Sequence, residues 1–290
     1  MNLIYQSSND FLPVVIIGAP RSGTNILRDT LSSLNNVGTW DCDEIPYIWL
    51  YSNKKYSTDM LQPIHATPKV KKYIRKQFSK LGEELQVENV LEKTCANSLR
   101  VDFIDSIFPE AKYIYIKRNG LDVTYSIMQR WNASFSLAYT MKKFKYVPIS
   151  DIPFYGIEFL KNRYYKEKNK DRLKFWGPRF AHENELSELS VEEISAKQWV
   201  ACVEESNKSF NKIDPKRVYS LTYENFVTNP KQQIKNMAMF MGITLNEKML
   251  FPTIRSSSIG KGEKMLSSHQ LEKIKPIIKK TMIDNQYTCP

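Results

Sequence analysis

The chain has 290 residues, of which 42% are hydrophobic and 12% aromatic. This length and composition exclude a disordered chain and allow a substantial buried core. Lys and Arg number 42 and Asp and Glu 31, so the formal net charge is +11. The excess points to anionic ligands such as nucleotides, phosphate or sulfate groups, acidic glycans or nucleic acid. A lysine-rich genome produces the same excess, so charge alone does not choose among them.

Cysteine and histidine usage indicates a reducing compartment and no metal site. The four cysteines lie far apart, without a C-x-x-C pair, so we expect free thiols. The three histidines are too scattered for a zinc site. The N-terminus lacks a basic region followed by a long apolar run, and no apolar run approaches the ~20 residues that span a bilayer. We therefore expect a cytoplasmic protein without a membrane span, although a lumenal enzyme without its anchor would look similar.

In chain order, four short apolar runs predict buried parallel strands. They are Val14–Ile17, Asn89–Leu91, Tyr113–Ile116 and Val218–Leu221. Amphipathic stretches predict five helices, at Asn25–Leu34, Ser98–Phe108, Leu121–Arg130, Ser195–Phe210 and Pro230–Met241. The alternation predicts a three-layer α/β fold in which helices flank a central parallel sheet. Ligand sites in such sheets lie beyond the carboxyl ends of the strands.

The first predicted strand leads into a loop that is typical of anion binding. Gly18 and Gly23 allow the backbone to turn, so that loop N–H groups and the dipole of the next helix point at one negative group. The glycine spacing is that of a nucleotide-triphosphatase P-loop, but Thr24 stands where that motif has Lys. The cation inside the loop is Arg21. We therefore expect a phosphate site that is not an ordinary ATP site.

A second motif follows the third predicted strand. The strand ends at Arg118, a helix begins around Asp122, and Ser126 lies about one turn inside it. Arg118 can bind a phosphate through two hydrogen bonds, and Ser126 can donate another. The alternative is a structural salt bridge at the strand end and a serine that faces solvent.

Residues 1–290 are expected to form one domain with a mainly helical insertion at about 132–194. The stretch 161–180 carries eight Lys and Arg against two acids, interleaved with aromatic side chains. It is either a solvated helical face or, as we favour, a basic lid that binds the acceptor. Later in the chain, Tyr223 ends the fourth strand and can contact an adenine, although packing tyrosines are commoner. The basic loop 255–264, with Gly260 and Lys261, can close over a ligand.

The order and spacing of these motifs resemble the sulfotransferases that use 3′-phosphoadenosine 5′-phosphosulfate (PAPS). The segment Gly18–Asn25 matches their G-x-P-R-S-G-T-[TS] loop, which holds the 5′-phosphosulfate. Arg118 and Ser126 fit the family's 3′-phosphate pair, and Tyr223 fits its adenine contact. The stretches 92–97 and 108–113 are similar to E-K-T-P-x-N and F-P-x-A-K-F of the bacterial and the glycan- or tyrosine-type members.

Four positions in three motifs depart from the family pattern. Cys95 replaces the Pro of E-K-T-P, and Asn119-Gly120 replaces the commoner D-P after the phosphate Arg. Gly260-Lys261 looks like the late G-K-W loop, but Gly262 stands where the family often has Trp. The last departure leaves open whether that loop contacts the nucleotide.

The resemblance implies an in-line transfer of a sulfuryl group without a metal ion. The N–H groups of Ser22, Gly23, Thr24 and Asn25 would cradle the 5′-phosphate, and Arg21 would follow the charge on the leaving oxygen. The product of the donor is adenosine 3′,5′-bisphosphate (PAP). Lys93 would bind the sulfuryl oxygens.

The resemblance also implies a general base that takes the proton of the acceptor hydroxyl. The K-T-H motif of phenol- and steroid-type enzymes is absent, because Cys95 occupies the place of its His. Glu44 lies in an acidic segment similar to that of tyrosine-type enzymes and is the expected base. Asp43, Glu92 and His65 are the alternatives.

The leading hypothesis is a PAPS-dependent sulfotransferase whose hydroxyl acceptor is on a carbohydrate. The arginine-type loop, the absent K-T-H and the basic aromatic insertion favour a glycan or another anionic acceptor. A tyrosine-bearing peptide, a lipid or a small metabolite stays open, as does the oligomeric state. A P-loop kinase or ATPase is the second hypothesis, against which the missing Lys counts. A noncatalytic binder of nucleic acid or acidic polymer is the third and rests on charge alone.

Overall fold

Five parallel strands form the sheet in the computed structural model, which describes residues 11–131, 142–157, 160, 176–245, 254 and 256–289. In chain order they are β1 (Leu12–Ile17), β2 (Val37–Gly38), β3 (Asn89–Lys93), β4 (Lys112–Lys117) and β5 (Val218–Thr222). They lie in the order β2-β3-β1-β4-β5, and each neighbouring pair is parallel. The winding direction changes between β1 and β4, where open α/β sheets bind their ligands.

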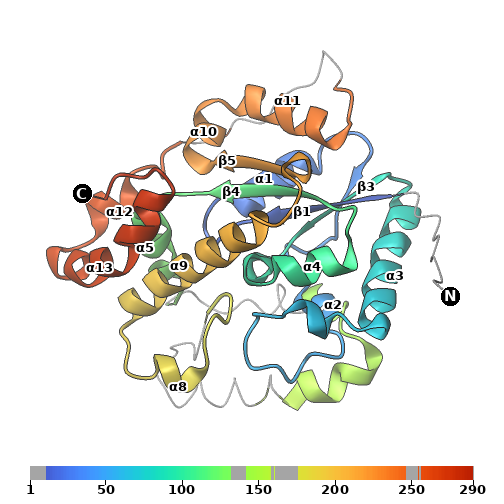
Figure 1. Cartoon of the computed structure of the whole chain (residues 1–290), viewed down its shortest axis with the longest axis horizontal. Helices are drawn as coiled ribbons and strands as arrows, with labels where there is room; N and C mark the ends of the chain where they lie inside the picture. Colours follow the sequence, from blue (N-terminus) through green and yellow to red (C-terminus); the bar gives the residue numbers. More distant parts are fainter. Residues whose placement is uncertain are drawn as a thin grey trace.

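Helices cover both faces of the sheet (Figure 1). On one face, Val14 and Ile16 of β1 pack in a core that includes α1 (Thr24–Leu31), α10 (Tyr223–Thr228) and α11 (Pro230–Met241). On the other face, Val15 and Ile17 pack in a core that includes α2 (Pro46–Trp49), α3 (Pro68–Leu85) and α4 (Val101–Ile107). A strand that is buried on both sides has no polar alternation, which explains its continuous apolar run.

A third core lies beside the carboxyl ends of the strands. It joins α5 (Gly120–Trp131), α9 (Val191–Phe210) and α13 (Ser268–Asp284). Trp199 of α9 is fully buried there, and its ring fills the space over Gly120. The short α12 (Lys261–Met265) packs on α5. This core fixes the start of α5, and therefore the position of the loop that follows β4.

The predicted fold class and the four predicted strands are confirmed, each strand as part of a strand of equal or greater length. The predicted helix Pro230–Met241 is confirmed at both ends. The predicted helix Ser98–Phe108 is instead a 3-10 turn, Cys95–Leu99, followed by α4. Arg100 breaks it with a φ of −145°, and the side chain of Arg100 is fully buried with its Nε donating to Asn97 Oδ1 at 2.8 Å.

Two long helices, α3 and α13, go beyond the predicted elements. Helix α3 begins after Thr67, whose Oγ1 accepts from the Val70 N–H at 3.4 Å, and it has Pro at its first position. It buries a narrow stripe at intervals of four residues, which is Val70, Ile74, Phe78 and Gly82. The remaining surface of this helix is rich in lysine, so the apolar pattern in its sequence is too weak to predict a helix.

The predicted helical insertion at 132–194 is described in part. The described part has helical turns at 142–144 and 152–157, the 3-10 turn Ile149–Asp151 and α8 (Glu183–Leu186). The stretches 132–141, 158–159 and 161–175, which hold most of the predicted basic aromatic lid, lie outside the described residues. Asp59 anchors the end of the insertion, because its carboxylate accepts from the Arg179 N–H at 2.8 Å.

Candidate active site

A cavity of about 590 Å³ lies at the carboxyl ends of β1, β3, β4 and β5. The segments that follow these four strands supply much of its wall, as the sheet topology predicts. Its lining comprises Pro20, Arg21, Gly23, Thr24, Asn25, Ile26, Asp43, Glu44, Pro46, Asp59, Thr94, Cys95, Ala96, Arg118, Arg130, Lys143, Trp176, Gly177, Pro178, Tyr223 and Ser258.

The loop between β1 and α1 forms an anion cradle. Its backbone is left-handed at Arg21 (φ +67°) and at Gly23 (φ +90°). Helix α1 begins at Thr24, and Gly23 caps it without a side-chain hydrogen bond. The first N–H groups of α1 are therefore not occupied by a side-chain cap, which is the arrangement that binds phosphate. The buried Ser22 Oγ also has no hydrogen-bond partner among the described residues.

Tyr223 closes one side of this cradle. A Cβ on Gly23 would lie 2.4 Å from Tyr223 Cδ2, so the ring leaves room for glycine only. The guanidinium carbon of Arg118 lies 4.2 Å from the centroid of the same ring, a cation–π contact. The Tyr223 hydroxyl and Ser258 Oγ form a hydrogen bond of 2.6 Å. The ends of β4 and β5 and the late loop are thereby joined at one side chain.

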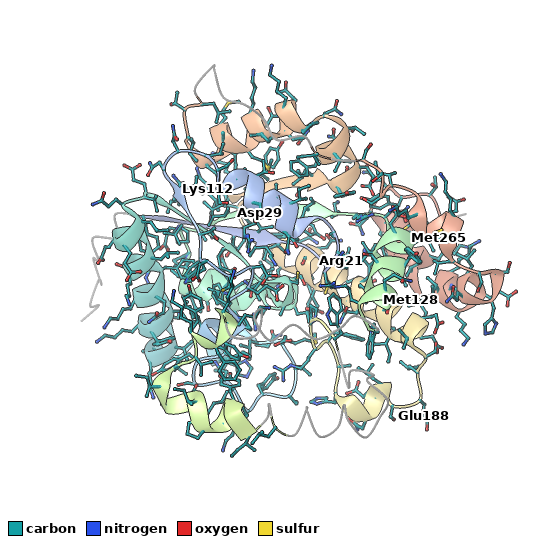
Figure 2. All side chains as sticks on the ribbon, turned by 180° about the vertical axis from the view of Figure 1, so that it is seen from behind. Arg21, Asp29, Lys112, Met128, Glu188 and Met265 are labelled. Atoms are coloured by element: carbon teal, nitrogen blue, oxygen red, sulfur yellow. The ribbon has the colours of Figure 1, made fainter. Side chains whose placement is uncertain are left out.

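The arginines of the two phosphate motifs are linked to each other. Arg118 Nη1 donates to the carbonyl oxygen of Arg21 at 2.9 Å, and its Nη2 donates to the Ser258 carbonyl at 2.7 Å. Arg21 Nε in turn donates to Ser126 Oγ at 3.0 Å. Figure 2 shows Arg21 between α1, which carries Asp29, and α5, which carries Met128. The structure thus brings the predicted 5′- and 3′-phosphate residues together.

The late loop is fastened to the start of α5. Asp122 accepts from the Gly260 N–H at 2.9 Å and from the Gly262 N–H at 2.7 Å. A Cβ on Gly262 would lie 2.3 Å from the carbonyl carbon of Leu121, so the two backbones touch. This close approach explains why Gly262 stands where the family often has Trp. Gly260 and Lys261 do not line the cavity, whereas Ser258 of the same loop does.

The acidic side of the cavity centres on Glu44. Its Oε1 accepts from Lys93 Nζ and from the Cys95 N–H, both at 3.2 Å, and its Oε2 accepts from Lys143 Nζ at 3.1 Å. Burial raises the pKa of this carboxyl, but the two ammonium groups and the hydrogen bond outweigh it and hold the pKa well below its usual range. Glu44 is therefore an anion in this arrangement, and Asp43 lies beside it, 3.7 Å from Lys143.

Lys93 pairs with Glu44 from outside the cavity. Its side chain is 1% exposed and does not line the cavity. Besides Glu44 it faces Asp43 Oδ2 at 3.9 Å. Burial lowers the pKa of Lys93, but the neighbouring carboxylates outweigh this and raise it overall. Lys93 was predicted to bind the sulfuryl oxygens, but in the structure its side chain is buried and pairs with the carboxylate of Glu44.

Cys95, the departure from the E-K-T-P motif, lies between the cradle and the acidic side. Its Sγ is 3.7 Å from Thr24 Oγ1, and its N–H binds Glu44. Burial raises the pKa of the Cys95 thiol to about 12. The thiol is therefore protonated and neutral, which makes it a poor replacement for the His of the K-T-H motif.

Two of the alternative bases do not line the cavity. Glu92 is fully buried behind it and accepts from Thr94 Oγ1 at 2.6 Å and from Asn97 Nδ2 at 2.7 Å. Burial raises the pKa of Glu92 to about 7. His65 lies on a 3-10 turn, where its Nδ1 accepts from the Gln62 N–H at 2.8 Å. Asp43 lines the cavity next to Glu44.

Sequence reasoning missed several residues that line the cavity. Arg130 follows Ser126 by four residues, so the spacing on one face of α5 was a usable signal. Trp176 belongs to the basic aromatic stretch 161–180 and Lys143 to the insertion at 132–194, both of which were predicted to bind the acceptor. Asp59 had no such signal and meets the other lining residues only in the folded protein. Asp59 is held by Arg179 Nη2 at 3.2 Å and lies 3.7 Å from Arg100 Nη1.

A family model described as a sulfotransferase domain matches residues 12–284. The chain belongs to the sulfotransferase family. The resemblance to the PAPS-dependent sulfotransferases is thereby confirmed: this sulfotransferase is an enzyme that uses PAPS as the sulfuryl donor. No curated protein sequence matches the chain significantly.

Solved sulfotransferase structures share this fold. The sulfotransferase domain from the curacin biosynthetic pathway matches with a TM-score of 0.59 and 12% identity, over 97% of this chain and 100% of that chain. The sulfotransferase domain of the Synechococcus PCC 7002 olefin synthase matches with a TM-score of 0.55 and 13% identity, over 97% and 96%. A sulfotransferase from Alicyclobacillus acidocaldarius matches with a TM-score of 0.53 and 12% identity, over 95% and 96%.

Two further findings concern the described part of this sulfotransferase. No helix there is both long and apolar enough to cross a membrane. No three His, Cys, Asp or Glu side chains there are grouped so that they can hold a metal ion. The cationic side chains that line the cavity are those of Arg21, Arg118, Arg130 and Lys143, and the N-terminus of α1 adjoins it.

Proposed function

We propose that this sulfotransferase moves the sulfuryl group of PAPS to a carbohydrate hydroxyl by in-line transfer, with Glu44 as the general base. The observation that carries the proposal is the composition of one cavity. The anion cradle with Arg21 and Arg118 meets the carboxylates of Asp43 and Glu44 within it. A reaction that joins an anionic donor to a hydroxyl acceptor needs these two kinds of group side by side.

At the donor end, the N–H groups of residues 22–25 bind the 5′-phosphate, while Arg118 and Ser126 bind the 3′-phosphate. The buried Arg118 Nε has no hydrogen-bond partner among the described residues, and a phosphate oxygen satisfies such a donor. Tyr223 contacts the adenine, and the late loop reaches the nucleotide through Ser258, the residue of this loop that lines the cavity.

During transfer, the bond between sulfur and the bridging oxygen breaks, and its electron pair goes to the 5′-phosphate of PAP. Arg21 neutralises that charge as a fixed cation, since guanidinium is too weak an acid to give up a proton. Glu44 takes the proton of the attacking hydroxyl. Lys93 keeps Glu44 in place and in its charged form.

The acceptor side of the cavity supports a sugar. Trp176 is among the lining residues, and the carboxylates of Asp43, Glu44 and Asp59 accept hydrogen bonds from hydroxyl groups. Lys143 and Arg130 add positive charge, which suits a sugar that carries an acidic group. We assign the insertion at 132–194 to acceptor binding.

All four cysteines are free thiols, which supports the proposed location in a reducing cytoplasm.

The test has a nucleotide arm and a transfer arm. PAP should raise the melting temperature of the protein, because it binds the native state. Arg118→Ala should abolish this shift, whereas Arg75→Ala, which removes a surface ion pair with Glu110, should preserve it. Transfer from radiolabelled PAPS is then compared between neutral and acidic oligosaccharides and tyrosine peptides. Absence of a PAP shift in the wild type overturns PAPS dependence, and labelling of peptides but no sugar overturns the carbohydrate acceptor.

A further inference from the structure

The two oxygens of Glu44 have different partners. Lys93 and the Cys95 N–H both donate to Oε1, and Lys143 donates to Oε2. Lys93 is 1% exposed and lies outside the lining, whereas Lys143 is 13% exposed and lines the cavity. One oxygen is therefore held by a buried, permanent pair of donors. The other is covered by an ammonium group that shares the cavity with the substrates.

This arrangement is unsuited to proton transfer as it stands. A carboxylate oxygen that accepts from an ammonium group is a weak base, and here it is also covered. If Lys143 moves away, Oε1 still has its two donors, so Glu44 is not left as an unpaired buried charge. The Lys143 ammonium is itself largely buried, so it leaves Glu44 only for another anion.

We propose that Lys143 is a catalytic residue that passes from Glu44 Oε2 to the sulfuryl oxygens when PAPS binds, and so uncovers the base only when the donor is present. The proposal rests on the proposed function of the site. The acceptor proton then goes to Oε2, the acceptor oxygen forms the new bond to sulfur, and the bridging S–O bond breaks towards PAP. Lys143 offsets the charge of the transferred group through the same step.

The position of Lys143 in the chain fits this role. It comes from the insertion, 99 residues from Glu44, so the insertion supplies it independently of the strand ends that hold the cradle. Asp43 Oδ1 lies 3.7 Å from Lys143 Nζ. It gives the ammonium a second anionic neighbour as the ammonium moves from Glu44 to the sulfuryl group. Lys145, two residues on, is 66% exposed and pairs with Asp41 at 3.1 Å. It is a matched control, because it has the same charge in the same segment.

The test compares PAPS with PAP, which differ by the sulfuryl group, and needs no acceptor. Calorimetric titration measures the affinity of the wild type, Lys143→Gln, Lys143→Arg and Lys145→Gln for both nucleotides. We expect Lys143→Gln to weaken PAPS binding about tenfold or more and to leave PAP binding within about twofold. Lys143→Arg should recover part of the loss, and Lys145→Gln should behave as the wild type.

Each other outcome is decisive. Equal loss of PAPS and PAP affinity in Lys143→Gln overturns the proposal, because Lys143 then serves the fold or the nucleotide. Unchanged affinity for both overturns it as well, since Lys143 then stays on Glu44. If the wild type binds neither nucleotide, the proposed function itself fails. PAP binding by Lys143→Gln shows that the variant is folded.

Discussion

The guanidinium group of Arg118 lies over the ring of Tyr223, with its central carbon 4.2 Å from the ring centroid. The two residues follow directly on β4 and β5, whose last paired residues are Lys117 and Thr222. Tyr223 also adjoins Gly23 of the cradle, and its hydroxyl and Ser258 Oγ of the late loop form a hydrogen bond. One buried aromatic side chain therefore aligns Arg118 with both loops that adjoin it.

Tyr223 should matter for nucleotide binding mainly through its ring. Tyr223→Leu keeps apolar volume but removes the surface on which Arg118 rests, and we expect PAP affinity to fall about tenfold or more. Tyr223→Phe loses the hydrogen bond to Ser258, and its PAP affinity should fall severalfold at most. Calorimetric titration with PAP measures both. Equal losses in the two variants would contradict a role for the ring.

Gly23 should tolerate no side chain. Gly23→Ala places a Cβ 2.4 Å from Tyr223 in a left-handed backbone, so the loop must shift. We expect a loss of about 1–3 kcal/mol in the free energy of unfolding and no detectable shift of the melting temperature by PAP. Gly156→Ala is the control, because nothing lies within 4 Å of its added Cβ. Chemical denaturation checks the first expectation, and a PAP-responsive Gly23→Ala variant would refute the second.

Glu44 should be required for transfer but not for donor binding. Glu44→Gln removes the proton acceptor, and we expect kcat to fall about 10²–10⁴-fold while PAP still stabilises the protein. Asp41→Asn is the control, since Asp41 is an exposed acid of the same segment that pairs with Lys145. Transfer assays with radiolabelled PAPS measure kcat. A Glu44→Gln enzyme with wild-type kcat would shift the role of base to Asp43.

Glu92 should make the protein less stable at alkaline pH. Its pKa is raised to about 7 by burial, above the usual value of a glutamate in the unfolded chain. The folded state therefore binds more protons than the unfolded state between about pH 4.5 and pH 7, and stability falls as the pH rises through this window. Glu92→Gln should flatten the decline. Urea denaturation at pH 5.5 and pH 8 measures it, and an unchanged pH dependence in Glu92→Gln would count against the raised pKa.

The sequence by itself determined four of the five strands, the cradle and the family. Val14–Ile17 leads without a break into Gly18–Asn25, so strand, turn and helix start are encoded by neighbouring residues. The residues that follow the strands, including Arg118 and Tyr223, were also predictable, because parallel strands place their carboxyl ends at one edge. Helix α3 escaped prediction because its apolar stripe is only one residue in four.

Only the tertiary structure decided how the charges are paired. Lys143 meets Glu44 across 99 residues, and Asp122 meets Gly260 across 138. Spacing predicts such contacts only within a helix or a strand, where geometry repeats. Burial arises from packing among all three cores. It raises the pKa of Glu92, and it distinguishes Lys93, which is hidden, from Lys143, which lines the cavity. The chemistry was therefore readable from local motifs, whereas the state of each charged group depended on distant parts of the chain.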